Sequence, residues 1–180
     1  MIQETALEIK EIVRALLDFA RERSDELSLI SLNDVAAQTV ELMRRTSAAK
    51  QVEIVEIIGD EDVPVEATAN QLKQIFVNLI SNAKQALKEA GGTITVEVGR
   101  DGDCAWAEVR DDGPGMPEHV SARIFEPFFT TRRDSGGTGL GLSVSLGIAE
   151  SHGGSLVVDE NEGGGATFRL QLPIAREDAT

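Results

Sequence analysis

The sequence lacks the features that mark several large classes of protein. Cys104 is the single cysteine among 180 residues, so a disulfide framework is excluded and a reducing, cytosolic setting is expected for this part of the protein. No apolar run approaches the roughly 20 residues that a membrane-spanning helix needs, and no secretory leader pattern opens the chain. Any membrane anchor of the parent protein would therefore lie outside this sequence.

Basic residues are also scarce. The chain has 17 lysines and arginines against 31 aspartates and glutamates, which gives a formal net charge of −14. Such an acidic surface repels nucleic acid and anionic membranes, so we expect no nucleic acid partner. An anionic ligand would need a local device that offsets this charge, such as a helix N-terminus, a glycine-rich nest or a metal ion.

Three common nucleotide and kinase motifs are absent. None of the lysines follows a glycine, which excludes a phosphate loop that ends in Gly-Lys-Ser/Thr. The spacing of Gly137, Gly139 and Gly141 does not fit a dinucleotide fingerprint, and the sequences that mark Ser/Thr/Tyr protein kinases are missing. The two histidines have no metal-type spacing with the cysteine, and we interpret His152 as a structural residue at a helix end.

The hydrophobic pattern that is present predicts a helical arm followed by one mixed domain. A helix is expected over 3–24, where apolar residues recur at i, i+3, i+4 and i+7. After a polar connection at 25–31, Ser31 or Asn33 caps a second helix that runs to about residue 50. The remaining elements are expected as helices at 68–90 and 140–151 and as strands at 51–58, 93–100, 104–110, 156–159 and 167–172.

This order of elements predicts an α+β fold. We expect a two-layer α/β sandwich, with a mixed, largely antiparallel sheet and helices on one face, preceded by the long helical arm. The arm would occupy residues 1–28 and the sandwich residues 31–175. Because no second helix of matching length is adjacent to the arm in the sequence, we expect its partner helix to be missing from this chain.

Two asparagines stand out on the helix at 68–90. Asn78 and Asn82 are four residues apart and share a helix face beside apolar residues. The simpler interpretation is a pair of exposed or mutually bonded amides. The alternative is that they bind a polar ligand over the helix, since an amide oxygen is a suitable ligand for Mg²⁺.

Three further segments could contribute to a ligand site. The turn 111–116, Asp-Asp-Gly-Pro-Gly-Met, follows a strand, and its aspartate could accept a hydrogen bond from an exocyclic amine. The glycine-rich run 136–143 opens a helix, where exposed N–H groups bind anions. Between them, Phe125, Phe128 and Phe129 form either a hydrophobic lid over a ligand or a satellite core. Each segment by itself is equally compatible with an ordinary turn or loop.

In this order and spacing, the segments resemble the ATP-binding domain shared by sensor histidine kinases, type II topoisomerases and related ATPases. The asparagine helix resembles the N box of this family, 111–115 its G1 box, 125–129 its F box and 137–142 its G2 box. The match covers about 31–174. The arm, with Leu16-Leu17-Asp18-Phe19-Ala20-Arg21, resembles the second helix of the dimerisation and phosphoacceptor hairpin of sensor kinases.

The resemblance implies a site for ATP and Mg²⁺. Asp111 would bind the adenine amine with Thr167 nearby through water, Asn82 would hold Mg²⁺, and Asn78 and Arg132 would be catalytic residues at the phosphates. The implied nucleotide-binding residues are, as a set, Asn78, Asn82, Asp111, Gly113, Gly115, Phe125, Phe128, Arg132, Gly137, Thr138, Gly139, Leu140, Gly141 and Thr167.

One residue distinguishes transfer from hydrolysis within this family. The hydrolysing members have a glutamate where this chain has Asn78, and an amide cannot activate water as a base. We therefore expect a protein-histidine kinase of a two-component system. The sequences Phe-Phe-Thr-Thr at 128–131 and Ser-His-Gly-Gly at 151–154 resemble the nitrogen-regulation type of histidine kinase in particular. The alternative is an anti-sigma-type module that binds ATP and a partner protein.

The chain also departs from the family pattern. It has no phosphoacceptor box, so we expect that it binds ATP with Mg²⁺ but does not phosphorylate itself. Arg132 replaces the more usual lysine, which keeps the charge and changes its geometry. The expected partners are the phosphoacceptor hairpin of the full-length protein and the receiver domain of a response regulator, and a homodimer could form through Ile9, Ile12 and Leu16.

Overall fold

The computed structural model describes residues 26–45, 51–132, 137–160 and 164–175. The arm predicted over 3–24 lies outside these residues, as does the predicted continuation of the second helix to residue 50. Among the helices within the described ranges, none has both the length and the apolar character that a membrane crossing requires.

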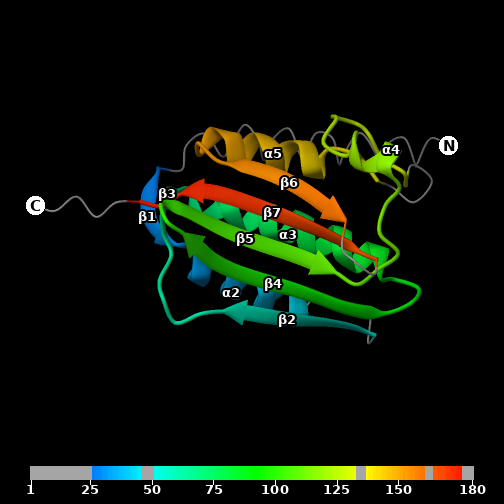
Figure 1. Cartoon of the computed structure of the whole chain (residues 1–180), viewed down its shortest axis with the longest axis horizontal. Helices are drawn as coiled ribbons and strands as arrows, with labels where there is room; N and C mark the ends of the chain where they lie inside the picture. The colour runs from blue at the N-terminus through cyan, green and yellow to red at the C-terminus, as the bar shows by residue number, and fades with distance from the viewer. Residues whose placement is uncertain (1–25, 46–50, 133–136, 161–163, 176–180) are drawn as a thin grey trace, which may run out of the picture.

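Five strands form one sheet in the order β2–β4–β5–β7–β6 (Figure 1). β2 and β4 run parallel, since a helix crosses between them, and the other neighbouring pairs are antiparallel. Alternation along β4 places Ile94, Val96 and Val98 on the buried face of the sheet. The bounds of the strands are β2 Val52–Ile58, β4 Gly92–Asp101, β5 Cys104–Asp111, β6 Ser155–Glu160 and β7 Ala166–Pro173.

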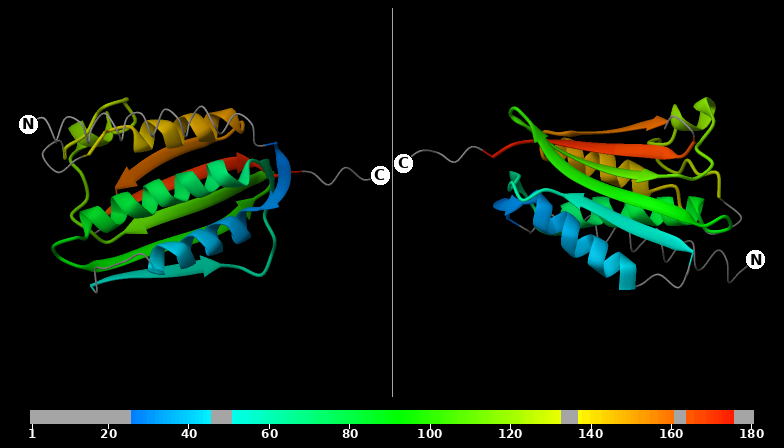
Figure 2. Two further views of the ribbon diagram at one scale, coloured as in Figure 1. Left: turned by 180° about the vertical axis from the view of Figure 1, so that it is seen from behind. Right: turned by 60° about the horizontal axis from the view of Figure 1, so that its bottom comes forward.

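Three helices, α2 Leu32–Arg45, α3 Ala69–Ala86 and α5 Gly141–Ser151, cover one face of this sheet (Figure 2). α2 packs on β2 and β4, α3 on β4 and β5, and α5 on β6 and β7. Helix α3 lies in the middle and contacts both other helices. Its apolar stripe forms the centre of the core: Leu72, Ile75, Phe76, Leu79, Ile80 and Ala83. The predicted two-layer α+β sandwich is therefore confirmed.

A second, two-stranded sheet corrects the prediction for the chain before α2. The polar connection expected at 25–31 contains strand β1, Ser28–Ser31, which pairs antiparallel with β3, Pro64–Ala67. Four residues are too few to show a strand alternation, and only Ile30 packs against the core. Strand β1 thus connects the chain before α2 to β3, and the predicted boundary of the sandwich at residue 31 stays a prediction. A one-turn helix α4, Glu118–Ser121, was also not predicted.

The ends of the helices follow local chemistry. Ser31 caps α2, since its Oγ accepts the N–H of Asp34 at 3.3 Å, in agreement with one of the two predicted caps. Thr68 precedes α3 in an extended conformation. At the other end, Gly91 adopts a φ of 74° and donates its N–H to the carbonyl of Leu87 at 2.8 Å. Helix α3 thus ends earlier than predicted, with the glycine closing the turn.

Candidate functional site

Asp111 is the last residue of β5 and is almost fully buried, with 4% of its surface exposed. Its Oδ1 accepts the N–H of Gly113 at 3.0 Å. Burial raises the pKa of Asp111 above its ordinary value, the charge of Asp112 also raises it, and backbone N–H groups of Gly113 and Ala166 act in the opposite direction. A buried carboxylate at a strand end suits the recognition of a ligand amine.

The turn after Asp111 packs against a second pair of glycines. Gly115 has a φ of 71°, and a Cβ on it would lie 3.3 Å from the carbonyl oxygen of Gly165. A Cβ on Gly164 would lie 3.2 Å from the carbonyl oxygen of Gly113. The two backbones can approach this closely because the residues at the points of contact are glycines. Gly164 was missed by the sequence analysis, although the run of glycines before β7 was a usable signal.

The same turn is fixed to the sheet and to α3. Asp112 accepts the N–H of Thr93 on Oδ1 at 2.8 Å, which ties the turn to the start of β4. A Cβ on Gly113 would lie 3.3 Å from the Leu87 side chain at the end of α3. Helix α3 therefore positions the turn of Asp111 and the two asparagines together.

The strand register separates Thr167 from Asp111. Thr167 lies opposite Arg110, so it shares the face of Arg110 and not that of Asp111. The backbone of Ala166, next to Thr167, bonds to the Asp111 carboxylate. The predicted contact of Thr167 with the adenine through water stays a prediction.

Asn78 bonds to α5. Its Nδ2 donates to the carbonyl oxygen of Gly141 and to the Oγ of Ser145, both at 3.1 Å, and Ser145 is fully buried. Neither of the two interpretations considered for the pair, mutually bonded amides or ligand-binding amides, includes this contact. Asn78 holds the first residues of α5 against α3.

Asn82 lies one turn further along α3 and has a different partner. Its Oδ1 accepts a hydrogen bond from the guanidinium Nη2 of Arg132 at 2.8 Å. Local bonds place Arg132, whose N–H is accepted by Thr130 Oγ1 at 3.0 Å and whose carbonyl accepts the N–H of Gly137 at 3.0 Å. The structure therefore brings together two of the predicted site residues that are 50 positions apart in the sequence.

The chain before α5 approaches the phenylalanine segment closely. Gly139 has a φ of 68°, and a Cβ on it would lie 2.5 Å from the carbonyl carbon of Phe128. Its carbonyl oxygen accepts the N–H of Phe128 at 2.9 Å. Thr138 Oγ1 lies 3.4 Å from the N–H of Leu140, which precedes the first turn of α5. The predicted helix thus begins in the glycine-rich run, beside Asn78, and its role in binding an anion stays a prediction.

The three phenylalanines have different environments. Phe125 packs edge-to-face on Phe168 of the core, with ring centroids 6.5 Å apart. Phe128 is 58% exposed and has a φ of 66°, which is the single positive φ among the described non-glycine residues. Phe129 stacks with the Arg123 guanidinium, 4.5 Å from its ring centroid. The satellite-core interpretation fits Phe125, whereas Phe128 is exposed beside the site.

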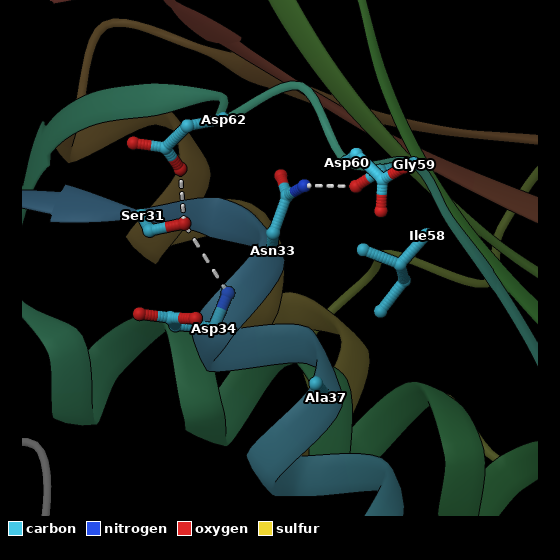
Figure 3. Close-up of a pocket in the computed structure, with 8 residues that line it drawn as sticks. All are labelled: Ser31, Asn33, Asp34, Ala37, Ile58, Gly59, Asp60 and Asp62. Carbon is cyan, nitrogen blue, oxygen red and sulfur yellow. Dashed lines mark hydrogen bonds between the residues drawn. The ribbon is translucent and has the colours of Figure 1, made fainter.

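A hollow of about 410 Å³ lies outside this cluster, around the start of α2 (Figure 3). It is close to the end of β2 that pairs with Val98, whereas Asp111 pairs with Ile94 nearer the other end of β4. Its lining includes Asp34, Asp60 and Asp62, which repel phosphate. Within the described ranges, no group of three or more histidine, cysteine or acidic side chains could hold a metal ion. The residues predicted to bind an anion lie instead at the start of α5, beside α3.

Comparisons with known proteins agree with the resemblance stated above. The family described as histidine kinase-, DNA gyrase B- and HSP90-like ATPase matches residues 67–176. The C4-dicarboxylate transport sensor protein DctS of Rhodobacter capsulatus is 33% identical over 171 residues, covering 93% of this chain and 26% of DctS.

Solved structures are also similar. The catalytic domain of the histidine kinase ThkA has a TM-score of 0.74 at 30% identity, covering 84% of this chain and 99% of that domain. ThkA in complex with the response regulator protein TrrA has a TM-score of 0.78 at 29% identity, covering 98% of this chain and 50% of that one. The chain spans about a quarter of the length of the curated relatives it matches. These relatives do not favour the anti-sigma-type alternative.

Proposed function

The chain belongs to the histidine kinase-, DNA gyrase B- and HSP90-like ATPase family, and from this premise we propose that its site binds ATP with Mg²⁺ and transfers the γ-phosphate to a histidine of a phosphoacceptor hairpin. The observation that carries the proposal is the position of α3. This one helix contacts the turn of Asp111, holds the start of α5 through Asn78 and presents Asn82 to a cation.

Each residue then has a physical role. Asp111 accepts a hydrogen bond from the adenine amine, and the glycines of its turn let the base approach the backbone. The first N–H groups of α5 bind phosphate oxygens, helped by the partial positive charge of a helix N-terminus. Arg132 adds a full positive charge in a chain whose net charge is −14. Catalysis is then positioning and electrostatic stabilisation.

The residues present fit a magnesium ion. Asn82 Oδ1 already accepts a hydrogen bond from a cationic group, so this oxygen points to a place where positive charge is favoured. One amide ligand is sufficient, because Mg²⁺ keeps several waters and binds substrate phosphates for the rest of its coordination. When bound, the ion would neutralise charge on the phosphates.

Transfer is favoured over hydrolysis by the chemistry of Asn78. An amide cannot remove a proton from water, and this one donates its Nδ2 hydrogens to Gly141 and Ser145. In the transfer, the bond from the γ-phosphorus to the ADP oxygen breaks, and a bond forms to the imidazole nitrogen that carries the free lone pair. The other ring nitrogen then releases its proton to solvent. The ThkA complex supports a response regulator receiver domain as the next acceptor.

The test is to incubate the chain with γ-labelled ATP, Mg²⁺ and a separately supplied phosphoacceptor hairpin. We expect label on the hairpin that is lost in acid, as phosphohistidine is, and no label on the chain itself. Asp111→Ala is expected to abolish the transfer. Label that is stable to acid, or release of inorganic phosphate without any transfer, would contradict the assignment.

A further inference from the structure

The contact between Arg132 and Asn82 concerns the same oxygen atom that we propose for Mg²⁺. Arg132 Nη2 lies 2.8 Å from Asn82 Oδ1, and both residues are half-buried. The backbone of Arg132 is held by two hydrogen bonds: its N–H donates to Thr130 Oγ1, and its carbonyl accepts the N–H of Gly137.

A guanidinium and a magnesium ion cannot both use this oxygen. Arginine has five N–H donors, no acceptor and a permanent positive charge. Mg²⁺ requires its oxygen ligands at about 2.0–2.1 Å and in near-octahedral geometry, which leaves no space for a second cation on the same lone pairs. Repulsion between the two charges disfavours their simultaneous approach.

We propose that Arg132 and Mg²⁺ compete for Oδ1 of Asn82, and that Arg132 thereby determines how strongly nucleotide binding depends on magnesium. The inference rests on the proposed ATP–Mg²⁺ site. Coordination of Asn82 to the ion requires Arg132 to leave the amide, and the phosphates offer the released guanidinium a bidentate partner. Without magnesium, Arg132 remains the main cation near the phosphates and supports a weaker binding of its own.

The experiment measures the dissociation constant of ADP by calorimetry, once with Mg²⁺ and once with a chelator. The quantity compared is the dissociation constant with the chelator divided by the dissociation constant with Mg²⁺, so a larger ratio means a stronger dependence on magnesium. Four forms of the full chain are compared: wild type, Arg132→Ala, Asn82→Ala and the double variant. Arg45→Ala is the matched control, since it removes the same charge from an exposed position on α2. Melting temperatures verify that each variant is folded.

Arg132→Ala is expected to increase this ratio about tenfold, the size of one charge-assisted hydrogen bond. In the Asn82→Ala variant, the Arg132→Ala substitution is expected to change the ratio by less than about twofold, because alanine lacks the Oδ1 for which Arg132 and Mg²⁺ compete. Arg45→Ala should leave the ratio unchanged.

Two results would overturn the inference, and they differ from each other. If Arg132→Ala changes the ratio equally in both backgrounds, or not at all, Arg132 acts only on phosphate and the competition is disproved, while the proposed function stands. If wild type binds ADP under neither condition, the proposed function fails and the inference fails with it.

Discussion

Folding removes the carboxylate of Asp111 from water, and the loss of hydration disfavours the charged form of this group in the folded protein. Its pKa in the folded chain is raised by burial, so over a range of pH the folded state holds a proton that the unfolded state has released. The contribution of Asp111 to stability is therefore present at low pH and is lost as the pH rises through the raised pKa. Near pH 7, the ionised group opposes folding.

We expect Asp111→Asn to raise the melting temperature at pH 7, because the amide carries no charge to desolvate, and to lower ADP affinity about ten- to hundredfold, because a charge-assisted bond to the adenine amine is lost. The gain in melting temperature should shrink as the pH is lowered. Asp112→Asn is the matched control, since Asp112 is exposed, and it should leave the affinity unchanged. A lower melting temperature for Asp111→Asn would contradict this account of the site.

Gly139 is a residue whose replacement tests the approach of two backbones. Gly139→Ala would place a methyl group 2.5 Å from the Phe128 carbonyl carbon, at a φ of 68° that a side chain rarely adopts. The strain is expected to cost about 1–3 kcal/mol and to displace the chain before α5. ATP affinity, measured by calorimetry, should fall more than adenosine affinity, since adenosine makes no phosphate contacts.

The control for Gly139 is a glycine on α5 itself. Gly147 has no heavy atom within 4 Å of an added Cβ, so Gly147→Ala meets no clash. As a substitution inside a helix, it is expected to stabilise the protein by up to about 1 kcal/mol without changing affinity for either ligand. Equal losses of ATP and adenosine affinity in Gly139→Ala would indicate general disruption rather than a local displacement.

Among the elements, α3 and α5 are joined by two hydrogen-bond links, one at the start of α5 and one at its end. Asn78 bonds to Gly141 at the start of α5, and His152 at its end accepts the N–H of Thr68 on Nε2 at 3.1 Å. The two links are ten residues apart on α3 and eleven on α5, or about 15–17 Å along each helix axis. The residue that comes later on α3 bonds to the residue that comes earlier on α5, so the two helices run antiparallel. This arrangement fixes the start of α5, where we propose that phosphate binds, beside the asparagines.

His152→Ala is expected to lower the free energy of unfolding by about 1–3 kcal/mol, because the backbone N–H of Thr68 loses its acceptor. The tautomer with its hydrogen on Nδ1 fits both contacts, because Nε2 then accepts the N–H of Thr68 and Nδ1 lies 2.8 Å from the carbonyl oxygen of Ile148. Urea denaturation measures the change. Ser151→Ala, next to it and exposed, should change stability by less than about 0.5 kcal/mol. Equal effects of the two substitutions would refute the proposed link.

The sequence pattern predicted the long elements well and the polar partners poorly. Strands β4 and β5 and the core face of α3 follow from alternation and helical periodicity, which are local properties. Strand β1 has too few residues for a pattern, and it forms because β3 offers a partner. The bonds of Asn78 to α5 and of Asn82 to Arg132 span 63 and 50 positions, so helix periodicity alone could not reveal them.

At the scale of the whole molecule, the described residues form one continuous core. Its buried members extend from Leu32 on α2 to Leu172 on β7. The small sheet closes onto the end of the chain, since Val65 bridges to Ile174 and the N–H of Ala175 donates to the carbonyl of Pro64 at 2.9 Å. From these contacts we propose that the ATP-binding domain extends over about 28–175 and folds as a unit.

A chain trimmed to 26–175 should therefore melt within about 2 °C of the full chain and bind ADP with Mg²⁺ with unchanged affinity, since each of the contacts described for the site is retained. Trimming to Leu32 provides the contrast. It removes β1, leaves β3 without its strand partner and uncovers the side of the core under Ile30. We expect a fall of several degrees, because 1 kcal/mol shifts the midpoint of a 150-residue domain by about 2–4 °C. If the 26–175 chain loses ADP binding while remaining folded, residues outside 26–175 contribute to the site and the domain boundary is wrong.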